Sequence, residues 1–526
     1  MNTSAKLQSL IDNLKNGETL NLNGEDYYLE KRIIISGKKD VVIDGGGAKI
    51  TTKYINSAHF SESVDAFLIT DCEGLQLKNI YFDTDVPTNV TATVKEILLD
   101  EKALVLEVDD VYNMKGNELF LSFNAIDDEG TPYRFGYYQK HPDPNIITVV
   151  QDEVLCASTY WGAKYDYLGN NTFKVYFEVS SFGELEVGNR LCIRHTMYGP
   201  SVIVLKDSND TVLKNITMYA TPGMGIMVFP RCNNLTIDGV KMIKKDGSHS
   251  LMACNCDGIH LTGAMGKFIM KNCEFDGMGD DALNIHTIAG TCTDVDLDER
   301  KIKCNYCKKS PDGKLKENWC AKGDTIKVFD PITMQNTGTF TVADYSNGYI
   351  TYENLQGELK PKDVMQNYTL TVACDISDCE IKNTRSRGFV IQTDDVEIKN
   401  SKFFGLSNAA VKVACCFGYW YEVGPATNFY MHDNIIEKCA YIDVNSPGIG
   451  VFTKHDGNDE KITGLHKNIK IENNTFRRMK NNMITVSSSD NVEIHGNRFV
   501  SRGEKEIPAV KFISCREVTE KDNSDI

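Results

Sequence analysis

Several features that would place a chain in a familiar class are missing here. None of the 526 residues belongs to an apolar run of 18 or more, so we expect no membrane-spanning segment and no membrane partner. The N-terminus lacks a basic stretch followed by an apolar core, which is the pattern of a signal peptide. We therefore expect a cytoplasmic protein, or a secreted one if a leader had already been removed.

Basic residues are outnumbered by acidic residues. The chain has 57 Lys and Arg against 73 Asp and Glu, for a net charge of −16. Nucleic-acid binding needs a basic face that neutralises phosphates, so we expect no nucleic-acid partner. A neutral glycan meets no such barrier, whereas an acidic pectin would be repelled unless basic residues lined the cleft.

Proline and tryptophan are scarce, with 13 and 3 residues, and helical periodicity is confined to residues 4–16. We predict an amphipathic helix there, ended by Gly17, that caps the open end of a solenoid. The 17 cysteines are odd in number and scattered, which indicates a reduced chain rather than a disulfide framework. We interpret most of them as small buried hydrophobes.

The most informative feature of the sequence is a recurring segment. It is a short alternating strand, then Asn or Gly, then a second apolar step, and it occurs at residues 74–82, 211–218, 234–242, 267–275, 395–403, 468–476 and 491–499. Alternation with a period of two marks a strand with one buried face. Asn and Gly tolerate the left-handed backbone of a sharp bend.

One such unit cannot bury its own apolar face, but stacked units can, at about 4.8 Å per coil. Many spacings between units fit one coil plus a loop, and the Leu/Asn spacing of leucine-rich repeats is absent. We predict an all-β, right-handed parallel β-helix (a solenoid) with an inserted domain resembling a β-barrel or sandwich.

The repeat divides the chain into five parts. Residues 1–87 hold the cap helix and first coils, and residues 201–289 and 373–526 hold later coils. Residues 88–200 and 290–372 have strand-like runs without the coil pattern, so we interpret both as β-rich insertions. Such insertions and the exposed edges of the solenoid favour self-association, so a homo-oligomer is expected.

The densest polar cluster contains three aspartates. Asp257 precedes Asp280 and Asp281 by 23 and 24 residues, about one coil, so their carboxyls can meet on one outer patch. Glycoside hydrolysis needs one protonated carboxyl and one ionised carboxylate, and crowded like charges raise at least one pKa. The alternative is that these are turn residues on a solvated surface. Coil-matched His260, Asn284 and His286 favour a catalytic cluster with substrate-binding neighbours.

Two adjacent aspartates on a strand would point to opposite faces. Both Asp280 and Asp281 can face the outside only at a bend or bulge, which Gly277 and Gly279 permit.

Four more residues are candidates for binding the sugar. Arg385 and Arg387 alternate on one side of a later coil and could donate to hydroxyls or bias the carboxylates; ordinary surface ion pairing is the alternative. Trp420 stands near Glu422, and together they could form a platform for the apolar face of a sugar. Tryptophan is also commonly a core residue, so a structural role stays open.

Four cysteines lie within one insertion. Cys304 and Cys307 have the two-residue gap of zinc knuckles, with Cys292 and Cys320 beside them. They are the candidates for a structural zinc. Because only one such pair occurs and cysteine is abundant throughout, we expect no cofactor and no catalytic metal.

Five motifs in one order resemble glycoside hydrolase family 110. They are residues 221–227 (TPGMGIM), 257–260 (DGIH), 279–286 (GDDALNIH), 383–389 (NTRSRGF) and 419–425 (YWYEVGP). The resemblance implies a β-helix with an accessory barrel and an inverting exo-α-1,3-galactosidase, acting on blood-group-B-type or linear α-galactose glycans.

The chain is more distantly similar to polygalacturonases, which place an Asp one coil before an Asp-Asp pair. That similarity implies Asp280 as proton donor, with Asp257 and Asp281 holding the water. Inversion predicts about 6.5–9.5 Å between the acid and base oxygens. Two other functions stay open: a polygalacturonase-like hydrolase of acidic polymers, and a non-catalytic β-helix that binds glycans.

Overall fold

The fold is known from a computed structural model. It describes residues 2–53, 65–109, 135–140, 147–155, 165–176, 182, 185–194, 199–248, 250–306, 319–417, 422–441, 446–454, 462–500 and 507–526.

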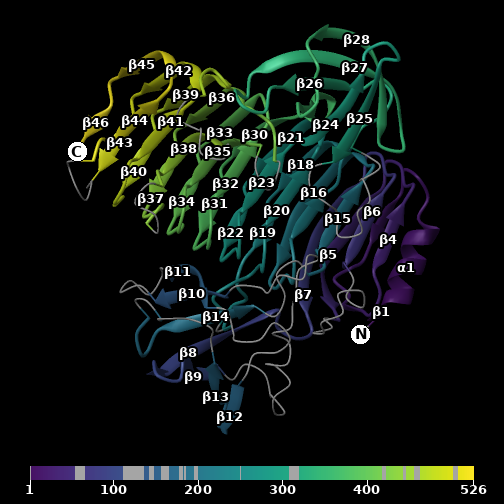
Figure 1. Ribbon diagram of the computed structural model, residues 1–526. Helices are drawn as coiled ribbons and strands as arrows, with labels where there is room; N and C mark the ends of the chain where they lie inside the picture. Colours follow the sequence, from purple (N-terminus) through teal and green to yellow (C-terminus); the bar gives the residue numbers. More distant parts are fainter. Residues whose placement is uncertain are drawn as a thin grey trace.

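The chain winds into a parallel β-helix, coil upon coil from the N-terminus to the C-terminus (Figure 1). Each coil contributes one strand to an 11-stranded sheet, called sheet B here, and the chain then crosses to a 22-stranded sheet A. Sheet B consists of β4 (Ile33–Ser36), β6 (Phe67–Thr70), β15 (Ile203–Lys206), β17 (Ile226–Val228), β20 (Ile259–Thr262), β23 (Leu283–His286), β32 (Phe389–Gln392), β35 (Val411–Cys416), β38 (Ile449–Lys454), β41 (Ile484–Ser487) and β44 (Val510–Ile513). The predicted fold class is confirmed.

Sheet A is also parallel, and most coils enter it twice, before and after a bend. Its strands are β1 (Asn2–Thr3), β2 (Thr19–Asn21), β3 (Tyr27–Leu29), β5 (Val42–Thr52), β7 (Gln76–Thr84), β16 (Asn209–Met218), β18 (Asn233–Asp238), β19 (Lys241–Met242), β21 (Met265–Lys271), β22 (Glu274–Asp276), β30 (Val372–Ser377), β31 (Glu380–Lys382), β33 (Val396–Lys399), β34 (Lys402–Phe404), β36 (Thr427–His432), β37 (Ile435–Glu437), β39 (His466–Glu472), β40 (Thr475–Arg477), β42 (Ser489–His495), β43 (Arg498–Val500), β45 (Arg516–Lys521) and β46 (Ser524–Asp525).

The bends fall where the sequence repeat puts Asn or Gly. Asn79, Asn215, Asn272 and Asn473 all have positive φ, between 50° and 58°. This left-handed conformation costs Asn less than other non-Gly residues, so the repeat marks the corner of each coil. The predicted role of these residues is confirmed.

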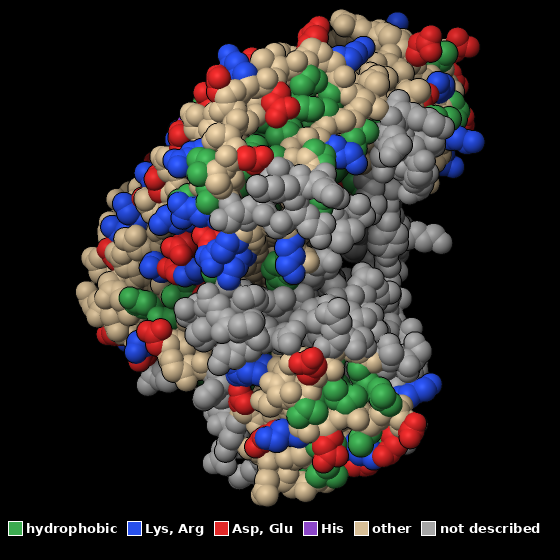
Figure 2. Space-filling view, turned by 90° about the vertical axis from the view of Figure 1, so that its left-hand side faces the viewer, with side chains coloured by type: hydrophobic (Ala, Val, Ile, Leu, Met, Phe, Trp, Pro, Cys, Tyr) green, Lys and Arg blue, Asp and Glu red, His purple; other side chains and the backbone are tan. Residues whose placement is uncertain are grey.

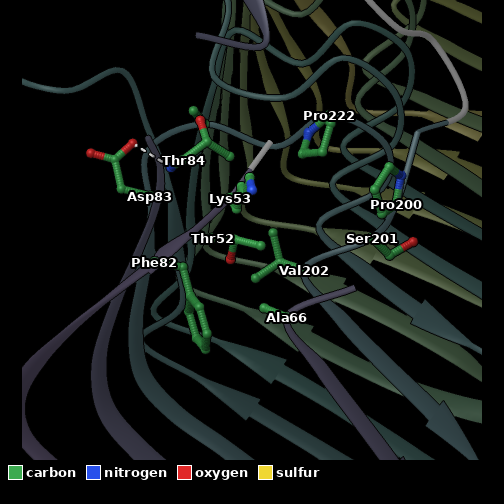
Figure 3. A pocket seen from close by; sticks show the side chains of 11 residues that line it. Thr52, Lys53, Ala66, Phe82, Asp83, Thr84, Pro200, Ser201, Val202 and Pro222 are labelled. Carbon is green, nitrogen blue, oxygen red and sulfur yellow. Dashed lines mark hydrogen bonds between the residues drawn. The ribbon is translucent and has the colours of Figure 1, made fainter. Parts of the chain in front are cut away.

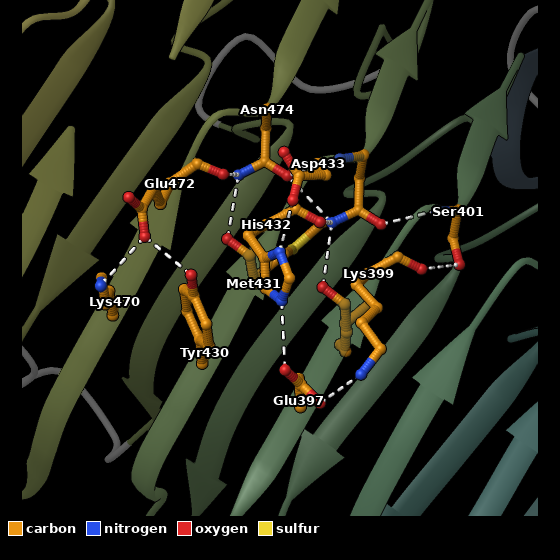
Figure 4. Close-up of polar contacts among 12 residues, drawn as sticks. Glu397, Lys399, Ser401, Tyr430, Met431, His432, Asp433, Lys470, Glu472 and Asn474 are labelled. Atoms are coloured by element: carbon orange, nitrogen blue, oxygen red, sulfur yellow. Dashed lines mark hydrogen bonds and ion pairs between the residues drawn. The ribbon is translucent and has the colours of Figure 1, made fainter. Parts of the chain in front are cut away.

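A buried polar side chain follows the bend in many coils and closes the corner. In the C-terminal coils this residue is Asn, and the amides form a ladder that crosses the rungs; Figure 4 shows one of its members, Asn474. Asn434 donates to Asn474 at 2.9 Å, Asn474 to Asn497 at 3.1 Å, and Asn497 to Asn523 at 3.1 Å. Each also donates to a backbone carbonyl, so the buried amide groups are paired.

Cysteine takes the same corner position in other coils. The thiols of Cys273, Cys379 and Cys439 each contact the carbonyl two residues earlier, at 3.2–3.4 Å. All 15 cysteines in the described part of the chain are free, and 14 of them are buried. Many of the cysteines are therefore small corner residues, interchangeable with Ser and Asn, as well as core hydrophobes.

Helix α1 (Ser4–Asn13) covers the N-terminal end of the solenoid (Figure 1). Its buried Leu7 and Ile11 join the core of the first coils. The helix ends at Asn13 rather than at residue 16, because Leu14 turns to an extended conformation with its side chain in that core. No helix in the described ranges is long and apolar enough to span a membrane.

An antiparallel sheet of seven strands projects from the solenoid between β7 and β15 (Figure 1). In spatial order it contains β11 (Ile147–Leu155), β10 (Phe135–Lys140), β14 (Arg190–Arg194), β8 (Asn89–Leu98), β9 (Ala103–Val108), β13 (Thr172–Tyr176) and β12 (Tyr165–Gly169). Asn89 fixes its root by donating to Asn255 at 3.0 Å, and Asn255 donates back to the carbonyl of Thr88 at 2.9 Å.

A closed six-stranded barrel is inserted between β23 and β30. It consists of β24 (Ile288–Asp296), β25 (Lys301–Tyr306), β28 (Tyr349–Gly357), β27 (Asn336–Ser346), β26 (Thr325–Phe329) and β29 (Val364–Asn367), followed by the short helix η3 (Tyr368–Leu370). Arg231 ties it to the solenoid through two contacts to Asp324, at 2.6 and 3.2 Å.

The zinc candidates lie in this barrel. Cys292, Cys304 and Cys320 are buried in its apolar core, and burial raises the pKa of Cys292 and Cys304 to about 12. These three sulfurs do not all come within 4.8 Å of one another. Cys307 falls outside the described residues. A zinc site there stays a prediction.

The surface mixes both signs of charge. Figure 2 shows Lys and Arg side chains interspersed with Asp and Glu on the face it presents. Ion pairs run between neighbouring coils, as between Lys241 and Glu274 at 3.1 Å and between Lys382 and Glu274 at 2.8 Å. The excess negative charge is thus distributed, and it does not by itself mark a site.

The corner ladder should be a major source of stability. Replacing buried Asn474 by Leu removes one acceptor of the Asn434 amide and one donor to each of the carbonyls of Met431 and Glu472. We expect a loss of about 2 kcal/mol or more, measured by urea unfolding followed by circular dichroism. The matched control is Asn491→Gly at an exposed position of positive φ within β42, where Gly keeps that φ and only an exposed contact to Asn468 is lost, so the change should be small. Equal losses would contradict a special role for the ladder.

Candidate active site

Three charged residues form a column at the start of sheet B strands. Asp257, Asp281 and Arg387 each lie two residues before a strand, on successive coils. The amide of Gly258 donates to the carbonyl of Asp281 at 2.9 Å, and the amide of Ala282 donates to that of Arg387 at 3.2 Å. Parallel backbone pairing therefore fixes these side chains beside one another.

The Asp280–Asp281 step lies in a bend before β23, as the sequence required. Close backbone packing forces glycine at 279, since a Cβ there would lie 2.3 Å from the carbonyl oxygen of Asn255. The bend places the two carboxyls in different environments. Asp281 is buried, whereas the Asp280 side chain is 24% exposed and is the most accessible of the three.

The three carboxyls converge as predicted, but more tightly than expected. One oxygen from each of Asp257, Asp280 and Asp281 lies within 4.8 Å of the others. The expected separation of 6.5–9.5 Å is wrong for these oxygens. Equivalent residues on adjacent coils are about 4.8 Å apart at the backbone, and Asp280 adjoins Asp281 on the same coil, so the three side chains can lean together.

Arg387 neutralises part of this cluster. Its Nε and one Nη each donate to Asp281 at 2.7 Å, in a bidentate contact. A second Nη contact reaches Asp280 at 3.9 Å, and Arg385 lies 3.7 Å from the same oxygen while donating to the carbonyl of Gly279. Close carboxylates suit either a cation or shared protons, and here a guanidinium already supplies the fixed positive charge.

The environment raises the pKa of both buried acids. Burial, and next the charge of Asp280, raise the pKa of Asp257 well above its ordinary value. Burial raises the pKa of Asp281 to about 7 against the pull of Arg387, whose own pKa is raised by Asp281 in spite of burial. A raised pKa favours a neutral Asp281, whereas the raised pKa of Arg387 reflects a charged Asp281, so the two shifts disagree about the state of this ion pair. The bidentate geometry matches an ionised Asp281, which we take as its resting form.

The strands after these residues present polar groups outward. His260 on β20 and Asn284 and His286 on β23 alternate with buried Ile and Leu residues. His260 contacts Asp257 at 2.7 Å and His286 at 3.1 Å. The structure therefore brings the predicted histidines into contact with the aspartate cluster.

Glu422 reaches the same patch from a loop between β35 and β36. The loop is held against the start of the barrel, where Thr287 donates its amide to the carbonyl of Val423 at 3.1 Å. Glu422 accepts from Asn284 at 3.5 Å and from Gln392 at 2.9 Å. Burial alone would raise the pKa of Glu422, but His286 and His260 hold it below its usual value. Trp420 lies outside the described residues.

Two acceptors in this patch lack a partner among the described residues. They are the buried side-chain oxygens of Asn284 and Gln392, whose amide nitrogens both donate to Glu422. Buried polar atoms are seldom left unpaired. Together with Glu422 they form a set of acceptors suited to hydroxyl donors.

Gln392 and Thr262 were not predicted from the sequence. Gln392 pairs with His286 across β23 and β32, and Thr262 pairs with His286 across β20 and β23. An alignment of the coils puts the final residues of Leu-Asn-Ile-His, Phe-Val-Ile-Gln and Ile-His-Leu-Thr in one outward column. Aligning the coils in the sequence would therefore have predicted Gln392 and Thr262.

A small cavity elsewhere shares no residue with this site. It has about 20 Å³ of space, room for roughly one water, and lies between the first coils and residues 200–222 (Figure 3). Phe82, Val202 and Pro222 are among its lining residues.

This chain is similar to one family model, to solved β-helix structures and to several named proteins. A family model described as right handed beta helix region matches residues 363–511. A polygalacturonase from Erwinia carotovora ssp. carotovora superimposes over 96% of each chain with a TM-score of 0.40 at 9% identity. The assignment of the fold rests on the strand pairing of this chain itself.

The sequence relatives are α-1,3-galactosidases by name. The chain is 24% identical over 472 residues to alpha-1,3-galactosidase A of Bacteroides fragilis, covering 88% of this chain and 74% of that protein. It is 22% identical over 464 residues to alpha-1,3-galactosidase B of Bacteroides thetaiotaomicron, covering 84% and 71%. The resemblance to glycoside hydrolase family 110 is confirmed.

Asp257→Asn should stabilise the fold above about pH 5. With a raised pKa the folded state retains a proton that the unfolded chain releases, so stability falls as pH rises from about 4 toward the raised value. Asn mimics the protonated carboxyl and avoids this loss, which is about 1.4 kcal/mol for each unit of the shift. The difference in Tm between variant and wild type should grow from pH 4.5 to pH 8.

Asp298→Asn, an exposed change in the barrel, is the matched control and should give the same difference at both pH values. An Asp257→Asn variant that is equally destabilised at both would contradict a raised pKa at Asp257.

Proposed function

We propose that this chain is an inverting exo-glycosidase that removes terminal α-1,3-linked galactose from glycans. The observation that carries the proposal is the convergence of Asp257, Asp280 and Asp281 beside Arg387 on one outer patch. The names of the sequence relatives support the bond type.

Asp280 is the proton donor in this proposal. It is the most accessible of the three carboxyls, and its contacts to Arg385 and Arg387 are long, at 3.7 and 3.9 Å. Its carboxyl can therefore turn toward the leaving oxygen. A positioned acid of this kind contributes typically about 10²–10⁴-fold to the rate.

Asp257 and Asp281 hold and deprotonate the attacking water. One oxygen of each lies within 4.8 Å of an oxygen of Asp280, which is shorter than the spacing of about 6.5–9.5 Å usual for inverting enzymes. Their oxygens are nevertheless engaged: Arg387 binds both oxygens of Asp281, while His260 and the amide of Asp281 bind those of Asp257. Side chains held this way are better suited to orient a water than to attack carbon, which favours inversion.

The sugar is neutral in this proposal. Asn284, Gln392 and Glu422 offer acceptors to hydroxyls, and Arg387 is committed to Asp281. A polygalacturonase-like function would need free basic groups for carboxylates of the substrate. Arg385 is occupied by the carbonyl of Gly279, so the basic residues of the patch do not favour it.

Asp280→Asn should abolish most hydrolysis. We expect wild type to release galactose from α-1,3-galactosyl oligosaccharides, linear or of blood-group-B type, one terminal residue at a time. The variant should be slower by about 10²-fold or more, because it lacks the transferable proton. Asp298→Asn, exposed and remote from the patch, should match wild type. Glycan binding without turnover in all three proteins would instead favour a non-catalytic β-helix, and equal turnover in all three would reject Asp280 as the proton donor.

The product should first appear as β-galactose. A single displacement by water inverts the α-linkage, and proton NMR recorded within the first minutes distinguishes the anomers before mutarotation. Initial formation of α-galactose would contradict the water-holding role and make Asp257 or Asp281 a nucleophile.

A further inference from the structure

A continuous chain of contacts starts at Asp257 and passes through both histidines. The carboxyl of Asp257 contacts Nδ1 of His260 at 2.7 Å, and Nε2 of His260 contacts Nε2 of His286 at 3.1 Å. Nδ1 of His286 lies 2.7 Å from the carbonyl oxygen of Thr287. The two rings meet edge to face, with centroids 5.1 Å apart.

The contacts restrict where protons can be. A carbonyl only accepts, so Nδ1 of His286 carries a hydrogen. When the relay is loaded, one hydrogen also lies between the two rings and one between His260 and Asp257. These requirements allow three arrangements with the same number of protons: a neutral Asp257 with two neutral rings, an ionised Asp257 with charged His260, or an ionised Asp257 with charged His286.

We propose that His260 and His286 form a proton relay that receives the proton taken by Asp257 from the attacking water. The relay rests on the proposed function. Water oxygen bonds to the anomeric carbon, the bond to the leaving oxygen breaks, and Asp280 protonates that oxygen. Before the attack Asp257 is a carboxylate, both rings are neutral, and the gap between Asp257 and His260 holds no hydrogen. The water proton enters at Asp257 and fills that gap, and one hydrogen then shifts across each gap to leave the charge on His286. Asp257 is then a carboxylate again. His286 releases one proton to solvent, and solvent returns one to Asp280.

The surroundings favour a charged ring. Glu422 lies close enough for the histidines to hold its pKa below its ordinary value, so their charges and that of Glu422 stabilise one another. The hydroxyl of Thr262, 3.3 Å from Nε2 of His286, is neutral and can adapt to either state. The charged and titratable groups that face the relay are Asp257, Asp280, Asp281, Glu422 and Arg387.

Both histidines are positioning residues under this scheme, since they act through Asp257. A purely structural role would predict that removing His286 lowers the rate equally at every pH. A relay predicts a change in the pH profile instead, because the excess proton loses its outermost position and remains nearer Asp257.

The first test is the pH profile of kcat/KM for His286→Gln on an α-1,3-galactosyl oligosaccharide. Gln can accept from His260 but cannot store a proton. The relay binds the excess proton less tightly once its outermost position is lost, so the acidic limb should move to lower pH by about one unit. The loss of activity relative to wild type should then be about tenfold smaller at pH 5 than at pH 8. His432→Gln is the matched control, since His432 contacts Glu397 and Asp433 on the outside of sheet A and should not move the limb (Figure 4). An unchanged limb in His286→Gln would overturn the relay.

The second test needs no turnover. In the full chain labelled with ¹⁵N-histidine, NMR should show His260 and His286 titrating in one shared step, with Asp257→Asn shifting the resonances of both rings. Single His→Gln variants give the assignments. Independent titration of the rings, or a His286 resonance indifferent to Asp257→Asn, would overturn the relay even in an active glycosidase. A shared step in a protein that hydrolyses no galactoside would support the relay and reject the proposed function.

Discussion

The spacing between adjacent coils is the constraint on which the site depends. Hydrogen bonding between parallel strands holds neighbouring coils about 4.8 Å apart, and no side chain alters that value. Asp257 and Asp281 occupy equivalent positions on successive coils, so their carboxyls are brought together by backbone pairing and not by a flexible loop. The fold therefore brings like charges close together, and the remaining residues of the patch offset their repulsion.

Two devices offset this crowding. Arg387, in the same column one coil later, binds Asp281 through both nitrogens that face it. Asp257 has no such cation and contacts a histidine instead. The two buried acids therefore differ in kind: a guanidinium fixes the charge of Asp281, while Asp257 contacts a histidine ring that can share a proton with it. Under the proposed function, this difference gives the base a place for its proton within a buried site.

Sequence reasoning reached the fold because the coil repeat is local. Alternating strands, left-handed Asn at the bends and the one-coil offset of the aspartates can all be recognised in the printed residues. The end of the first helix could not be found that way, since Leu14 leaves the helix to fill the core of the first coils. The carboxyl separation was predicted from a general rule for inverting enzymes and was wrong, because the directions in which the three side chains lean cannot be read from the sequence. Gln392 was missed because one Gln carries no motif, and only its column reveals it.

The residue at which the barrel is inserted contacts both the His286 side and the Glu422 side of the patch. The chain leaves β23 at His286 and enters the barrel at Ile288, so Thr287 is the single link between them. Thr287 accepts from Gln366 of the barrel at 3.1 Å and donates to the carbonyl of Val423, next to Glu422. Its own carbonyl fixes the hydrogen on Nδ1 of His286. One residue thus sets the tautomer of the last histidine and helps to place its anionic neighbour, so the pairing of the first barrel strand supports the geometry of the patch.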